Sequence, residues 1–131
     1  MKQLLMLTAV IELGAGLALL CCPSAAVALL LGAPLDGGAA LVVARVGGTG
    51  LLTLGVACWL AHYDEKSQAA RGVVSAMVLY NLGAVAILAA AAHSAQPVSV
   101  ALWLAIVLHA AMTVWCVASL LENQSRRKEE L

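Results

Sequence analysis

Long runs of apolar residues fill most of the chain, and short polar segments separate them. A run of about 20 apolar residues is long enough to cross the hydrocarbon core of a bilayer as a helix. The pattern therefore predicts an all-α protein, a bundle of four transmembrane helices joined by short loops. The predicted spans cover residues 4–22 with a continuation to 31, 39–61, 72–92 and 98–121.

The first apolar run is too long for one upright span. It extends from Leu4 to Leu31, which corresponds to about 42 Å of helix against a hydrocarbon core of roughly 30 Å. Pro23 lies inside this run, and proline removes a backbone hydrogen bond from a helix interior. We expect the first helix to kink at Pro23 and to continue as a short segment, followed by a loop around Asp36.

The composition agrees with a membrane protein and excludes other classes. The chain of 131 residues is 63% hydrophobic and only 11% charged, whereas an ordinary soluble domain has about 25% charged residues. Four spans and short loops leave room for a single integral membrane domain, residues 1–131, whose last ten residues, 122–131, form a tail. Phe is absent and only 4% of the residues are aromatic, so a nucleic-acid surface is not expected. The expected partner is the lipid bilayer.

The Lys and Arg residues outside the predicted spans fall on one side of the bundle. They are Lys2, Lys66, Arg71, Arg126, Arg127 and Lys128. The loops around Asp36 and Gln96 contain no Lys or Arg. Because cytoplasmic loops carry the excess of basic residues, both termini are expected in the cytoplasm, with Asp36 and Gln96 on the opposite side.

Small residues at four-residue spacing predict helix contacts, because such residues let helices approach closely in lipid. One row on the first span is Gly14, Ala18 and Cys22, and one on the second is Ala40, Ala44 and Gly48.

Each predicted span carries one strongly polar residue near its middle: Glu12, Arg45, Asn81 and His109. Such residues are costly in hydrocarbon and normally face a partner or a cavity, so they are candidates for a functional site. By helical rise, the first, third and fourth of these residues lie in one layer, roughly 12 to 14 Å from the cytoplasmic boundary. The candidate ligand or proton site consists of Glu12, Arg45, Tyr80, Asn81, His109 and Thr113.

The same count places Arg45 about 9 Å above Glu12, close enough for two long side chains to form an ion pair. Two interpretations remain open at this point. The cluster is either a structural network that fixes the packing of the helices, or a site that binds a ligand or carries a proton.

The four cysteines give a weaker hypothesis. Cys21 and Cys22 are adjacent, and soft metal ions prefer thiolate ligands. This pair is similar to the paired cysteines in the first span of mercury-uptake membrane proteins. A cysteine in an apolar helix is otherwise a small hydrophobic residue, so no metal site is the main expectation. No motif identifies a cofactor, and the absence of a nucleophile elbow favours a function other than catalysis.

The first half of the chain resembles small bacterial four-helix membrane proteins of the DoxX-like kind, many of which are uncharacterised. The resemblance is carried by Gly16–Leu20, Pro23, Leu29–Gly32, Arg45–Gly48, Leu51-Leu52 and Leu54-Gly55. It implies a four-helix bundle in a bacterial inner membrane. Together with the polar residues, it leads us to expect a protein that holds a small apolar ligand or has an accessory role beside a larger membrane complex, with homo-oligomers as a further option.

A second comparison gives the alternative function. Glu12 is at a similar place to the single Glu in the first helix of the small multidrug-resistance transporters, which exchange protons for cationic drugs. The chain departs from that family at Arg45, because an arginine near Glu12 would repel a cation. Proton-coupled transport is therefore second to a binding role, and soft-metal transport is third.

Overall fold

The computed structural model describes residues 1–94 and 99–129. These residues form α-helices and one short 3₁₀ turn, with no strand in the described ranges, which confirms the predicted all-α class. Four of the helices are long and apolar enough to span a membrane, which indicates an integral membrane protein. The elements are α1 (Lys2–Cys21), α2 (Pro23–Leu31), α3 (Gly38–Ala61), η1 (His62–Asp64), α4 (Gln68–Ser94) and α5 (Val100–Glu129). Gln96 lies outside the described residues.

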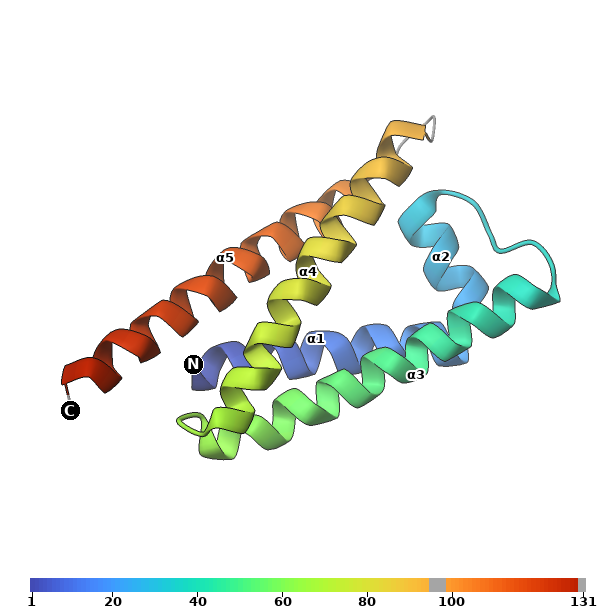
Figure 1. The fold of residues 1–131 in the computed structure, drawn as a ribbon. Helices are drawn as coiled ribbons and strands as arrows, with labels where there is room; N and C mark the ends of the chain where they lie inside the picture. The colour runs from blue at the N-terminus through green and yellow to red at the C-terminus, as the bar shows by residue number, and fades with distance from the viewer. Residues whose placement is uncertain (95–98, 130–131) are drawn as a thin grey trace.

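The predicted kink at Pro23 is a complete break between two helices. The backbone of Cys22 has φ −132° and ψ 56°, outside the helical region, because a following proline disfavours the α conformation. Pro23 is the first residue of α2, where a missing N–H costs no hydrogen bond. The helix ends at Gly32, whose φ of 81° is readily adopted by glycine. Figure 1 shows that α2 turns away from the axis of α1 toward α5.

Two serines set where the last two helices begin. The Ser67 Oγ accepts a hydrogen bond from the Ala70 N–H at 3.0 Å, and this cap starts α4 before position 72, where the apolar pattern placed it. The Ser99 Oγ accepts from the Leu102 N–H at 3.0 Å at the start of α5. The Ser99 hydroxyl also donates to the Leu30 carbonyl oxygen, which otherwise would have no partner at the end of α2. This bond joins α2 to α5.

Glycines bring α1 and α3 into close contact. A Cβ built on Gly48 would lie 2.8 Å from the Gly16 carbonyl oxygen, and one on Gly55 would lie 2.8 Å from Leu13 Cγ. Only hydrogen side chains fit such a contact. The two backbones therefore run side by side and antiparallel, as Figure 1 shows.

The contact uses a different face of α1 from the one predicted. The predicted row of Gly14, Ala18 and Cys22 is exposed, whereas Gly16 is buried. On α3, Gly48 of the predicted row is buried in the contact. The buried residues of α1 recur at three- and four-residue spacing, which is the pattern of one helix face. They are Leu4, Leu5, Thr8, Ala9, Glu12 and Gly16.

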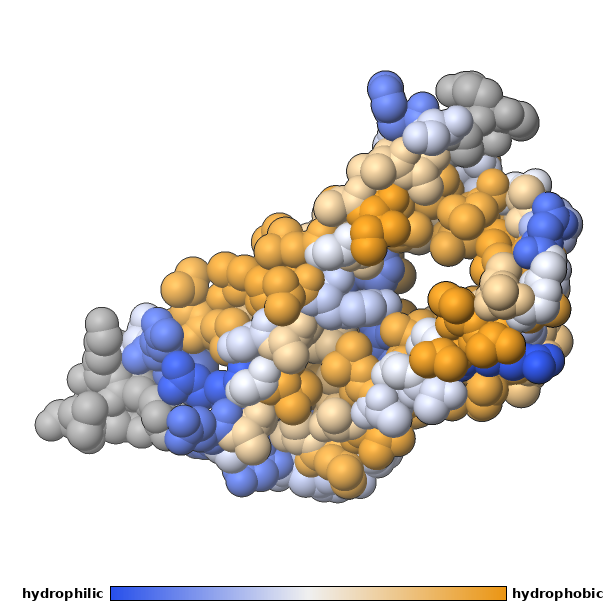
Figure 2. All heavy atoms as spheres, turned by 45° about the vertical axis from the view of Figure 1, so that its right-hand side comes forward, coloured by the Kyte–Doolittle hydropathy of each residue, from blue (hydrophilic) through white to orange (hydrophobic). Residues whose placement is uncertain are grey.

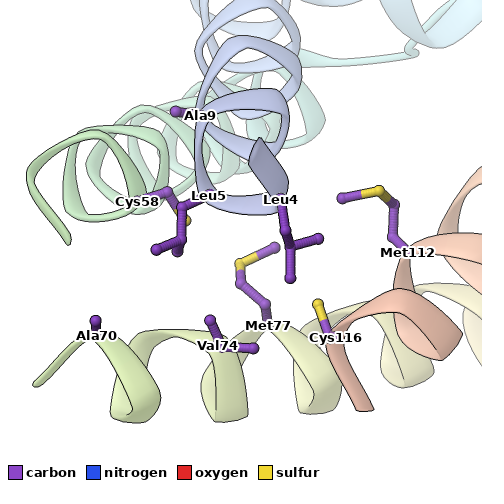
Figure 3. Packing of buried hydrophobic residues seen from close by; sticks show 9 residues of the cluster. All are labelled: Leu4, Leu5, Ala9, Cys58, Ala70, Val74, Met77, Met112 and Cys116. Carbon is purple, nitrogen blue, oxygen red and sulfur yellow. The ribbon is translucent and has the colours of Figure 1, made fainter. Parts of the chain in front are cut away.

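The four long helices form two pairs, α1 with α3 and α4 with α5 (Figure 1). The pairs meet at one end in a cluster of buried apolar side chains, here called the apolar core (Figure 3). Its members are Leu4, Leu5, Ala9, Cys58, Ala70, Val74, Met77, Met112 and Cys116. Away from this end the pairs diverge, and α2 reaches across to α5 at the far end.

The beginning and the end of the described chain lie at the same end of the molecule as the apolar core. The Lys2 backbone N–H donates to the Glu65 carboxylate in the segment between α3 and α4. The Asn123 side chain of α5 donates to the Met1 sulfur at 3.9 Å. Both ends of the described chain therefore lie at one end of the molecule, and their cytoplasmic placement stays a prediction.

Candidate binding site between the helix pairs

A cavity of about 760 Å³ lies where the two helix pairs diverge. Its wall comes mainly from α1, α2, α4 and α5, with Leu51 from α3, and is mostly apolar. Figure 2 shows an opening that passes through the molecule and is bordered largely by hydrophobic residues. Because the opening lies between helices of spanning length, it faces the side of the molecule that lipid would surround. We call this space the lateral cavity.

Polar side chains are placed at one end of the lateral cavity. Glu12 is near the start of the stretch of α1 that lines it, which runs from residue 11 to 19. In α4, residues 79–88 line the cavity, and Tyr80 is near the start of this stretch. In α5, residues 101–109 line it, and His109 is at the end of this stretch. Since α4 and α5 are antiparallel, all three side chains lie at the end nearest the apolar core.

Four residues form what we call the polar cluster: Glu12, Tyr80, Asn81 and His109. The Asn81 Nδ2 donates to the Met77 carbonyl oxygen at 2.7 Å, and the Asn81 Oδ1 lies 2.8 Å from His109 Nδ1. The Tyr80 ring packs edge to face against the His109 ring, with centroids 5.7 Å apart. The Tyr80 hydroxyl interacts with the Glu12 carboxyl group.

The polar cluster is well shielded from the surroundings. Glu12 is only 3% exposed and Asn81 only 1%, so each lies within the helix packing although both helices are apolar. A buried polar group is costly unless it has hydrogen-bonding partners, and the cluster supplies them across three helices. The structure thus brings together four of the six residues that the sequence selected. Thr113 lies one turn beyond His109 and donates to its carbonyl oxygen at 2.9 Å.

Arg45 is placed away from the polar cluster, on the exposed face of α3. Gly48 meets Gly16 and the backbone of Leu20, so Arg45, one turn before Gly48, lies level with the end of α1. That position is about ten residues, or roughly 15 Å, along the helix axis from Glu12. The two described side chains form no ion pair, and the predicted pair is wrong. The estimate from helical rise, which placed Arg45 about 9 Å above Glu12, failed because α1 and α3 are shifted along each other.

The cysteines do not converge. Cys21 and Cys22 are exposed at the break after α1, while Cys58 and Cys116 are buried in the apolar core at the other end. Within residues 1–94 and 99–129, no three His, Cys, Asp or Glu side chains are grouped to hold a metal ion. The soft-metal hypothesis based on Cys21 and Cys22 gains no support from the placement of the four thiols.

Small residues line the lateral cavity. They include Gly83 and Ala84 on α4 and Ala101 and Ala105 on α5. The four-residue spacing of Ala101, Ala105 and His109 put these three on one helix face, but no cavity was predicted there. A Cβ built on Gly83 would meet no atom within 4 Å, so this position borders open space. The many Ala and Gly residues of the chain were a signal, but they did not indicate which ones would face a cavity.

Thr8 was also missed. Its side chain is 2% exposed, and its Oγ1 is a buried polar atom without a hydrogen-bond partner among the described residues. It lies one turn before Glu12 on the same face of α1. A threonine in a helix usually satisfies its hydroxyl within the helix, so its type alone gave no signal.

Comparison of the chain with family models, with curated proteins and with solved structures found no match. We therefore argue function from the lateral cavity and the polar cluster.

Proposed function

We propose that this membrane protein binds a small amphipathic molecule that is dissolved in the bilayer. Its apolar part occupies the lateral cavity between the helix pairs, and its polar end reaches the polar cluster. The observation that carries this proposal is the coincidence of a mostly apolar cavity with Glu12, Tyr80 and His109 at one end. Apolar pockets with a few convergent polar groups are typical of small-molecule sites.

The size and position of the cavity support the proposal. About 760 Å³ lies within the range of roughly 300 to 1,000 Å³ that small-molecule pockets occupy. The opening between the pairs gives a lipid-soluble molecule a lateral route into the site (Figure 2). On the side of the chain ends, the two helix pairs pack against each other through the apolar core (Figure 3). A binding role is therefore better supported than conduction across the membrane.

The proposed setting is a bacterial inner membrane, with the chain ends and the segment around Glu65 in the cytoplasm. The distribution of Lys and Arg supports this orientation. The resemblance to DoxX-like proteins supports the bacterial setting and stays a prediction. In this setting the protein holds its ligand as an accessory beside a larger membrane complex or as an oligomer of its own chain.

Photolabelling tests the binding function. The protein is reconstituted in phosphatidylcholine nanodiscs with a diazirine-bearing analogue of dodecanol, irradiated, and mapped by peptide mass spectrometry. We expect saturable labelling in residues 79–88 and 101–109, which excess dodecanol displaces. Gly83→Leu should remove this labelling, because its side chain enters the open space beside Gly83.

Gly47→Leu is the matched control. Gly47 is exposed on α3 with no atom near its Cβ position, and it does not line the cavity. Labelling that spreads evenly over exposed helix faces, or that is reduced equally by both leucine variants, would show that the protein has no such site.

Proton-coupled transport of a hydrophobic cation is the second candidate, and the placement of Arg45 favours it. Arg45 lies too far from Glu12 to neutralise it or to repel a cation at the lateral cavity. Transport requires that the cation displace a proton from Glu12. Reconstituted protein in unbuffered solution would then acidify it when tetraphenylphosphonium is added, and Glu12→Gln would abolish the signal. No acidification would rule this candidate out.

A further inference from the structure

The hydrogen bonds behind the lateral cavity fix the proton position on His109. A backbone carbonyl oxygen only accepts hydrogen bonds, so the Asn81 atom 2.7 Å from the Met77 oxygen is the donating Nδ2. The other amide atom, Oδ1, is an acceptor, and it lies 2.8 Å from His109 Nδ1. His109 Nδ1 must therefore carry a proton. In the neutral imidazole the second nitrogen, Nε2, is then an acceptor.

His109 Nε2 is available to a ligand. It has no hydrogen-bond partner among the described residues. It is also not fully buried, because the buried polar atoms without a partner do not include it. Since the His109 ring lines the lateral cavity, Nε2 is accessible from that space. Asn81 itself is 1% exposed and lies behind the ring, where it acts as a positioning residue.

The other polar groups at this end of the cavity also favour a donor on the ligand. The Tyr80 hydroxyl is an O–H donor on a residue that lines the cavity, but it interacts with the Glu12 carboxyl group. What remains for a ligand is acceptor capacity on His109 Nε2, and on the Glu12 oxygens when this carboxyl group is ionised. An apolar molecule that carries only acceptors would leave these groups unpaired, which is costly for polar groups shielded by an apolar ligand.

We propose that the lateral cavity is specific for an apolar alcohol, whose hydroxyl donates a hydrogen bond to His109 Nε2 while its chain lies between the helix pairs. This inference rests on the proposed binding function and names the end group of the ligand. Asn81 determines the preference, because it holds the proton on Nδ1.

Competition between matched molecules tests the proposal. Dodecanol and dodecyl methyl ether share the same chain, and only the alcohol has an O–H donor. Before irradiation, each is added to nanodiscs that contain the protein and the diazirine alcohol. We expect half-displacement by dodecanol at about a tenfold lower concentration than by the ether, the factor that one hydrogen bond of ordinary strength supplies. Equal displacement by both would overturn the alcohol preference while leaving the binding site in place.

Two other outcomes are also decisive. Dodecyltrimethylammonium has the same chain and a positive charge but no donor, so stronger displacement by it than by dodecanol would overturn the proposal in favour of a cation. A complete lack of saturable labelling would instead show that the binding function itself is wrong.

Histidine ¹⁵N spectra give a readout that a merely structural role of Asn81 would not change. His109 is assigned by loss of its signals in His109→Gln. We expect an unprotonated Nε2 and a protonated Nδ1, with a shift of Nε2 when dodecanol is added and none with the ether. In Asn81→Leu the proton is free to move, so the alcohol-to-ether ratio should fall toward one. A protonated Nε2 in the unaltered protein would overturn the proposal even if Asn81→Leu fails to fold.

Discussion

Tyr80 is the residue that connects the two helix pairs beside the lateral cavity. Its hydroxyl interacts with Glu12 of α1, and its ring packs against His109 of α5. Glu12 thereby gains a polar contact in a region where an isolated carboxyl group would be costly. The same contact holds the polar groups of the two pairs at one end of the cavity.

Double-mutant cycles test these contacts residue by residue. Glu12→Gln and Tyr80→Phe should be coupled by about 0.5 kcal/mol or more in the free energy of unfolding, because the two side chains share one interaction. Glu12→Gln and Arg45→Gln should be additive within about 0.5 kcal/mol, because distant sites act independently. Denaturant unfolding in detergent micelles provides the values. Coupling of Glu12 to Arg45 without coupling to Tyr80 would contradict the structure.

The members of the polar cluster were predictable, because a polar residue within an apolar span is conspicuous in a sequence. Glu12, Asn81 and His109 were placed in one layer by helical rise alone, and the structure brings them together around Tyr80. The partner of Glu12 was not predictable. It depends on the shift between α1 and α3, which is a property of their contact and not of either helix.

The contact between α1 and α3 depends on glycines that face each other. Gly16→Ala and Gly48→Ala should each lower stability by about 1 to 3 kcal/mol, since the new methyl group would lie 2.8 Å from a backbone oxygen of the other helix. Gly14→Ala and Gly47→Ala are matched controls with no atom near the new methyl group, and they should leave stability unchanged or slightly higher. Thermal unfolding in micelles distinguishes them. Similar losses in all four variants would contradict this packing.

An interruption at Pro23 was predicted, because it follows from the chemistry of proline. The starts of α4 and α5 were not predicted, since the apolar pattern placed them at 72 and 98, whereas the capping residues Ser67 and Ser99 set them at 68 and 100. The face that α1 presents to α3 was not predictable. The chain has so many Ala and Gly residues that several rows of small side chains have helix-contact spacing, and only packing selects Gly16 over Gly14.

The two helix pairs diverge and leave the lateral cavity between them. The sequence predicted the number of spans, but a predicted bundle does not specify how its helices pair. In a bilayer the apolar faces of all four helices are equally compatible with lipid, so contact depends on shape, not on burial from water. The apolar core joins the pairs at one end, and the bond between Ser99 and Leu30 joins α2 to α5 at the other.

The orientation of the whole molecule is tested by labelling with a membrane-impermeant maleimide. Single cysteines are introduced at Asp36 and Lys66 in a Cys21→Ala, Cys22→Ala background, since these two native cysteines are exposed. We expect Asp36→Cys to react from outside intact cells and Lys66→Cys only after the membrane is opened, because basic residues favour the cytoplasmic side. The reverse pattern would show the opposite orientation.

Detection of direct contact between a ligand and the wall of the lateral cavity is the most decisive test of the binding site. The protein is labelled with ¹³C at alanine methyl groups and placed in nanodiscs of deuterated lipid with protonated dodecanol. We predict saturable nuclear Overhauser effects from the dodecanol chain to Ala84, Ala101 and Ala105, which line the cavity, and their loss in Gly83→Leu. Ala110, exposed on α5 outside the cavity, should show no saturable effect. Equal effects at Ala105 and Ala110 would contradict a binding site between the helix pairs.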